Sequence, residues 1–214
     1  MLIFLIILCL YSVKTISRNS DWKNNFTLFS ADVSHSPNSA RTHYNLGTEL
    51  FNWSVKQTSE EKRKEYLNKA VVELKKAVSI SPGYLDAMNN LGSTYQNLHM
   101  LDSAIAVYRK VVEIDSNYHK SDLELGICYY KKGQYREAIP CLQSVLRYHG
   151  DNETAYTLIG SSYGSLGNFT EAIRYLEKSI AINGKNTDAL SLLAKGYGIK
   201  GEFTKSVEIF NRII

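Results

Sequence analysis

The residue types that catalyse reactions or bind metal ions are present in this chain, but their spacing favours no reactive centre. The histidines stand at positions 35, 43, 99, 119 and 149, and the cysteines at 9, 128 and 141. A zinc site would normally show a CxxC pair or paired histidines, and neither occurs here. No Ser/His/Asp or paired-carboxylate arrangement is favoured either. We therefore predict no catalytic residue, no metal site and no cofactor, and we expect His43 to be a packed core residue.

Two cysteines could form a disulfide only if the fold brings them together. Cys128 and Cys141 fall on two neighbouring predicted helices. Cα separations between helices often exceed the limit of about 7 Å for a disulfide. We expect free thiols, with a disulfide in an oxidising compartment as the alternative.

Four N-x-S/T triplets could accept glycans in a eukaryotic lumen, whereas in a bacterium they would have no such meaning. They begin at Asn25, Asn52, Asn152 and Asn168. Asn168 falls in an expected turn between helices. Both interpretations stay open.

The elements that position these side chains follow from an internal repeat with a constant step. Its marks are Gly92, Gly126, Gly160 and Ala194, each preceded by leucine or isoleucine. A tyrosine follows each mark, then a small residue, then a large apolar residue, always at the same spacing. A period of about 34 residues predicts an array of helix–turn–helix units. The small residues let two helices approach closely, so they are packing residues and do not form a phosphate loop.

One unit illustrates the predicted helices. Apolar residues at helical spacing predict a first helix over 119–132 and a second over 135–148. Gly133 separates them at a place that suits a positive φ, and Gly167 and Gly201 occupy the equivalent places. Each helix pair leaves one apolar face that only a neighbouring pair can cover.

The repeat frame resembles the tetratricopeptide (TPR) family. The resemblance implies an all-α fold, a right-handed TPR superhelix (an α-solenoid) of about five repeats. Leu46 and Gly47 match the first helix of an earlier repeat, but the small residue Ala70 follows Gly47 at nearly twice the spacing of the later repeats. We predict that the insertion lengthens the second helix at its start as a surface elaboration, with Thr58 and Glu61 as a capping box.

The resemblance also assigns a peptide-binding groove to the first helices of the repeats. The main candidate groove residues are Asp86, Asn89, Asn90, Ser93, Gln96, Asn97, Lys120, Tyr130, Lys131, Thr157 and Ser161. The same carry-over adds Leu123, Ile127, Thr154, Gly164, Ser165, Asp188, Ser191, Lys195, Gly198 and Ile199. This set is largely small and polar, which suits hydrogen bonds to an extended peptide.

The amino terminus differs in kind from the repeats. Residues 1–11 form an uncharged apolar run, about half of the ~20 residues that span a bilayer. Neither a basic region before the run nor a small-residue cleavage site after it indicates a signal peptide. We interpret residues 1–13 as the remnant of a transmembrane helix. A short membrane anchor and a soluble protein with an apolar end are the alternatives.

An amphipathic helix is predicted next, over residues 20–35 of a juxtamembrane segment 14–36. Trp22, Phe26, Phe29 and Val33 share one face, and Ser20 or Asn19 would cap the helix. This face could pack on the first repeat or lie at a membrane surface. The predicted repeats then cover 37–82, 83–116, 117–150, 151–184 and, incompletely, 185–214. The last repeat stops within its second helix, so we expect a fragment of a longer protein.

The residues around this junction resemble a second, more specific family. They are Arg18-Asn19-x-x-Trp22, Leu28-Phe29, Asp32-Val33, Pro37-x-Ser39-Ala40 and His43-Tyr44-Asn45-Leu46-Gly47. They look like the junction between the last transmembrane helix and the first repeat of the transmembrane and TPR-repeat O-mannosyltransferases, which are of the GT-C type. The resemblance implies that the repeats present acceptor proteins to a catalytic half that this chain lacks.

Partners and location follow from these interpretations. The formal net charge is +4, and basic residues alternate with acids without a dense basic stripe, which argues against nucleic acid. We expect a protein or extended peptide as the partner, and contact with a membrane through the amino terminus. The family resemblance implies extracytosolic repeats (ER lumen or periplasmic side), although Lys14, Arg18 and Lys23 favour a cytoplasmic side. The alternative function is a stand-alone membrane-anchored scaffold for complex assembly.

Overall fold

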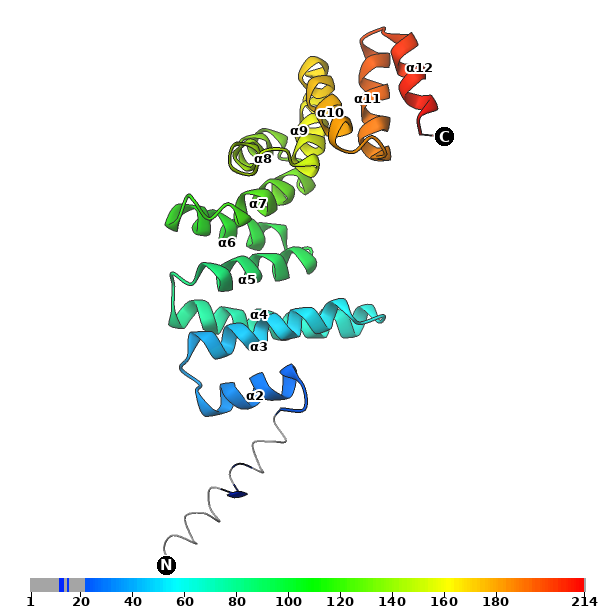
Figure 1. Cartoon of the computed structure of the whole chain (residues 1–214). Helices are drawn as coiled ribbons and strands as arrows, with labels where there is room; N and C mark the ends of the chain where they lie inside the picture. Colours follow the sequence, from blue (N-terminus) through cyan, green and yellow to red (C-terminus); the bar gives the residue numbers. More distant parts are fainter. Residues whose placement is uncertain (1–11, 14, 16–21, 214) are drawn as a thin grey trace, which may run out of the picture. The chain divides into compact units, whose positions relative to one another are not determined.

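The computed structural model describes residues 12–13, 15 and 22–213. All regular elements in these ranges are α-helices, as the repeat pattern predicts. They divide into two compact units, one ending at Leu98 and the other beginning at His99. Within each unit, helices that follow one another along the chain pack side by side (Figure 1).

The first unit contains the inserted repeat and the helix before it. Its helices are α2 (Asn25–His35), α3 (Ala40–Val55), α4 (Glu60–Ile80) and α5 (Leu85–Asn97). The insertion lengthens α4, as predicted, because this helix has 21 residues. Its N-cap is Ser59, whose hydroxyl accepts a hydrogen bond from the backbone N–H of Lys62. The predicted cap at Thr58 was therefore one residue too early.

The amino-terminal helix is shorter than predicted. α2 begins at Asn25 and not near residue 20, because Asn24 and Thr27 form a reciprocal capping box. Trp22 precedes the helix and is 66% exposed. The ring of Phe26 lies 6.2 Å from that of Trp53 on α3, so α2 packs on the first repeat.

The predicted transmembrane remnant lies almost entirely outside the described residues, of which only 12 and 13 belong to it. No helix in the described ranges combines the length and hydropathy that a membrane crossing requires.

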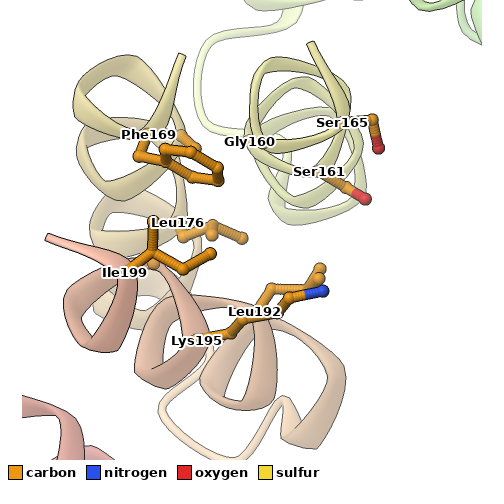
Figure 2. Close-up of a pocket in the computed structure, with 11 residues that line it drawn as sticks. Gly160, Ser161, Ser165, Phe169, Leu176, Leu192, Lys195 and Ile199 are labelled. Carbon is orange, nitrogen blue, oxygen red and sulfur yellow. The ribbon is translucent and has the colours of Figure 1, made fainter. Parts of the chain in front are cut away.

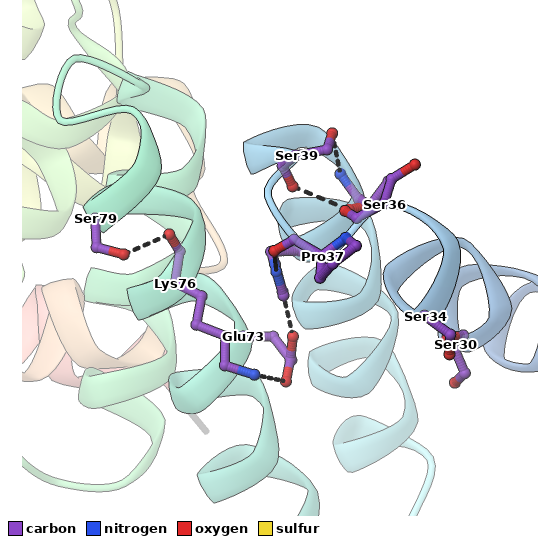
Figure 3. A network of polar contacts seen from close by, with 10 residues as sticks. Ser30, Ser34, Ser36, Pro37, Ser39, Glu73, Lys76 and Ser79 are labelled. Atoms are coloured by element: carbon purple, nitrogen blue, oxygen red, sulfur yellow. Dashed lines mark hydrogen bonds and ion pairs between the residues drawn. The ribbon is translucent and has the colours of Figure 1, made fainter.

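A polar network fixes the loop between α2 and α3 to α4 (Figure 3). His43 is 2% exposed, as its predicted core position requires. Its Nδ1 lies 2.6 Å from Oε2 of Glu73 on α4, and its Nε2 lies 2.8 Å from the carbonyl oxygen of Pro37. The same glutamate accepts from Lys76 through Oε1 at 3.4 Å. One buried ring thus joins two helices and the loop that enters them.

The second unit holds the remaining helices. They are α6 (Leu101–Ile114), α7 (Lys120–Lys131), α8 (Tyr135–His149), α9 (Glu153–Ser165), α10 (Phe169–Ile182), α11 (Thr187–Ile199) and α12 (Phe203–Asn211). One apolar cluster centres on Leu142 and Ile159, and another on Leu176 and Leu190. Asn152, Asn168 and Asn186 cap α9, α10 and α11 through their side-chain oxygens.

The small residues of the repeat allow close approach within helix pairs. A Cβ built on Gly47, Gly126 or Gly160 would lie 2.7 Å from Cγ of Leu74, Leu142 or Leu176 of the paired helix. The turn glycines also behave as predicted, because Gly133, Gly167 and Gly201 have φ of 74°, 80° and 79°.

Candidate functional site

Several predicted groove residues are used to join helices. In the first unit, Asn90 donates through Nδ2 to Oγ1 of Thr48 on α3, at 2.9 Å. Asn97 accepts from Nη2 of Arg63 on α4 at 3.2 Å, and its own amide donates to the carbonyl of Ser93. These side chains hold α5 to the preceding helix pair. Asp86, Asn89 and Gln96 lie on the same helix, and Asp86 is exposed.

The second unit uses its groove residues in a similar way. The hydroxyl oxygens of Tyr130 on α7 and Ser161 on α9 lie 2.8 Å apart. The hydroxyl of Thr157 lies 2.7 Å from that of Ser179 on α10 and accepts from Asn186 at 3.3 Å. Thr157 is therefore part of the packing between repeats and does not face a ligand with a free hydroxyl.

Two further predicted groove residues of this unit are the lysines of α7. Lys120 and Lys131 are both exposed on α7. The ammonium group of Lys120 lies 5.8 Å from the ring centre of Tyr118, within reach of a cation–π contact. These two cations therefore stay at the surface, where they could meet an anionic partner.

A pocket of about 210 Å³ lies between α9, α10 and α11. Figure 2 shows its lining. The residues are Gly160, Ser161, Gly164, Ser165, Phe169, Ala172, Leu176, Leu192, Lys195, Gly196 and Ile199. Five of them belong to the carried-over groove set: Ser161, Gly164, Ser165, Lys195 and Ile199. The structure thus brings five of the ten predicted groove residues of repeats four and five together at one cavity.

The pocket exists because α9 is built of small residues on one side. Gly160 is required for close approach to Leu176. Gly164 occupies the position that Tyr130 holds one repeat earlier, so glycine replaces a large ring at that place. A Cβ on Gly164 would meet only Cβ of Ala172, at an ordinary contact distance of 3.7 Å. The missing side chain leaves the space open.

The pocket has an apolar side and a polar side. Phe169, Leu176 and Ile199 supply the apolar side, while the hydroxyls of Ser161 and Ser165 and the ammonium of Lys195 lie at the opposite side (Figure 2). Lys195 is exposed, and no carboxylate in the described part of the chain pairs with it. Lys205 on α12, by contrast, is paired with Glu202 at 2.7 Å. The pocket can therefore take an apolar group and hold an anionic group beside it.

Sequence reasoning missed most of the apolar side of this pocket, of which only Ile199 belongs to the predicted groove set. Phe169 and Leu176 come from the second helix of their repeat, whose residues the repeat pattern assigns to helix packing, and Leu192 stands where Asn90 stands three repeats earlier. The signal that could have found them is the run of small residues in α9. Because these side chains are short, they leave the facing side chains of the neighbouring helices uncovered.

The two cysteines of the second unit are free, as expected. Burial raises the pKa of the Cys128 thiol and of the Cys141 thiol to about 11. Because only a thiolate is a strong nucleophile, neither cysteine has the properties of a reactive centre at neutral pH.

Comparisons with known proteins agree with the helical repeats. The family "Anaphase-promoting complex, cyclosome, subunit 3" matches residues 97–179. The crystal structure of YrrB, described as a TPR protein with an unusual peptide-binding site, has a TM-score of 0.74 and 18% identity, covering 87% of this chain and 90% of that one. The crystal structure of MamA has a TM-score of 0.68 and 25% identity, covering 73% of this chain and 92% of that one. The chain thus has the helical-repeat fold of TPR proteins.

A sequence relative adds a more specific likeness. The chain is 31% identical over 89 residues to the mouse protein O-mannosyl-transferase TMTC3, a match that covers 42% of this chain and 8% of the relative. The chain therefore resembles a small part of a protein of that family, in line with the likeness seen at the amino-terminal junction.

Proposed function

We propose that this chain binds protein segments in an extended form, and that it presents them as acceptors to a membrane O-mannosyltransferase-like enzyme. The observation that carries the binding role is the pocket between α9, α10 and α11, which is open and lined by both apolar and polar groups. The similarity to mouse TMTC3 supports the enzyme context. The binding residues are those of the pocket, together with the exposed Lys120 and Lys131 of α7.

The proposed location is the extracytosolic side of a membrane. It rests on the family resemblance of the amino-terminal junction and on the apolar run at residues 1–11. In that setting the repeats would meet acceptor proteins on the side where lipid-linked sugars are used.

The test is a measurement of the native product in source cells. An antibody against residues 59–80 would detect it, since α4 begins with exposed charged side chains. The proposal predicts a membrane band far above 24.2 kDa, with an epitope that resists protease in sealed vesicles and is cleaved after detergent. A membrane band near 24.2 kDa would favour the anchored scaffold instead. A soluble product, or an epitope cleaved without detergent, would overturn the proposed location.

A further inference from the structure

The pocket between α9, α10 and α11 is too small for a large ligand. Its volume of about 210 Å³ lies below the ~300 Å³ at which small-molecule sites usually begin. It is large enough for one aliphatic or aromatic side chain of a peptide that continues along the surface. Ile199 is 51% exposed at its edge, so entry needs no opening of the helices.

The apolar side of the pocket would receive that side chain. Leu176 is buried beneath it, and Phe169 and Leu192 are half-buried at its walls. Covering these surfaces removes apolar area from water, which contributes about 25 cal/mol per Å². A polar side chain in the same place would lose its hydration without gaining a partner.

The polar side of the pocket favours a particular charge on the peptide residue next to the apolar one. Lys195 has no carboxylate partner in the described chain, and the hydroxyl-bearing residues of the pocket lining, Ser161 and Ser165, are uncharged. Each other pocket residue is uncharged, so Lys195 is the one charged side chain of this lining. An anionic group beside the apolar residue would pair with its ammonium group, and a cationic one would be repelled.

We propose that this pocket selects extended peptides that carry an aliphatic or aromatic residue next to an acidic one. The apolar side chain lies between Phe169, Leu176 and Ile199, and the carboxylate pairs with Lys195. This inference rests on the proposed peptide-binding function and defines its ligand class.

The experiment measures fluorescence anisotropy of labelled peptides with the full chain. The probes are a degenerate decapeptide pool and four defined peptides in a Gly/Ser background. One defined peptide contains Leu-Asp, and the other three contain Ser-Asp, Leu-Asn or Leu-Lys. We expect Leu-Asp to bind about tenfold more tightly than each of the others.

Charge is tested with a matched pair of lysine variants. Lys195→Glu should weaken binding of the Leu-Asp peptide by about tenfold and strengthen that of Leu-Lys. Lys185→Glu changes net charge equally, at an exposed position outside the pocket, and should leave both affinities unchanged.

The apolar side is tested by filling the pocket. Gly164→Ala should weaken binding of the Leu-Asp peptide, and Gly164→Leu should weaken it more. Melting followed by circular dichroism should show no loss of stability for Gly164→Ala, since a Cβ at 164 makes only an ordinary contact, and should show that Gly164→Leu stays folded at the temperature of the binding assay.

The outcomes separate the two proposals. If no peptide binds, the pool included, both the binding function and this inference are wrong. If the pool binds but Leu-Asp has no advantage, or if the two lysine variants behave alike, the inference is wrong and the binding function stands. A Leu-Asp preference that Lys195→Glu reverses and Gly164→Leu removes supports both.

Discussion

His99 is the residue whose backbone departs most clearly from its repeat. It stands one repeat before Gly133, at the turn position that glycine occupies in the later repeats. Its φ is 58°, in the left-handed region that side chains disfavour. The strain in such a residue is of the order of 1–2 kcal/mol.

We expect His99→Gly to stabilise the protein. Relief of strain is partly offset by the larger backbone entropy of glycine in the unfolded chain, which leaves a gain of about 0.5–1 kcal/mol. Urea unfolding would measure it. The reverse change, Gly133→His, should destabilise the protein, and a His99→Gly variant less stable than the parent would contradict the account of this turn.

The thiols of the second unit give a prediction for pH. Both Cys128 and Cys141 have a pKa near 11 because burial disfavours the thiolate, against an ordinary value of 9.0. The folded state therefore holds these protons more tightly than the unfolded state. Their contribution to stability is present below pH 9 and is lost as the pH rises towards 11.

At about pH 8 we expect both thiols to react with an aromatic disulfide reagent more than tenfold more slowly than free cysteine does. A Cys9→Ser background removes the third thiol. Guanidinium should restore normal rates. Fast reaction of either thiol in the folded protein would show that it is more accessible than the structure indicates.

At the scale of elements, the packing glycines set the distance within a helix pair. Gly160 has the backbone of Ala172 and the side chain of Leu176 within 3.1 Å of a built Cβ. We expect Gly160→Ala to destabilise the protein by about 1–2 kcal/mol, because overpacking outweighs the better helix propensity of alanine.

A double-mutant cycle checks this reason. In a Leu176→Ala background the side-chain obstruction is gone and only the contact with the backbone of Ala172 remains, so Gly160→Ala should cost clearly less, as measured by urea unfolding. If Gly160→Ala lowered the free energy of unfolding equally in both backgrounds, its effect would not come from the close approach of α9 and α10.

The helix pairs could be predicted from sequence because each depends on one or two local features. A missing side chain at Gly126 or a positive φ at Gly133 shows directly in the repeat. Helix starts were less predictable, because neighbouring residues compete to cap, as Thr58 and Ser59 do before α4.

The use of groove side chains could not be predicted in the same way. Asn90 and Thr157 lie at groove positions, yet their rotamers direct them to Thr48 and Ser179 on other helices. A hydrogen bond between residues so distant in the chain depends on the angle between helices, which the repeat pattern does not specify. The pocket likewise combines side chains from three helices.

At the scale of the whole molecule, we propose that binding takes place where the helices leave space. The predicted groove residues of α5 include Asn90 and Asn97, which join helices. The open cavity lies in α9 to α11 instead. The proposed role beside a catalytic partner would require binding groups at this place, and it would require no reactive side chain there.

Photo-cross-linking tests this central claim most directly. The Leu-Asp peptide would carry photo-leucine at its apolar position, be irradiated with the full chain, and have its adducts located by mass spectrometry. The account predicts adducts on Phe169, Leu192 and Ile199, which disappear in the Gly164→Leu variant. Adducts confined to residues 22–98, or adducts at the pocket that persist in that variant, would contradict it.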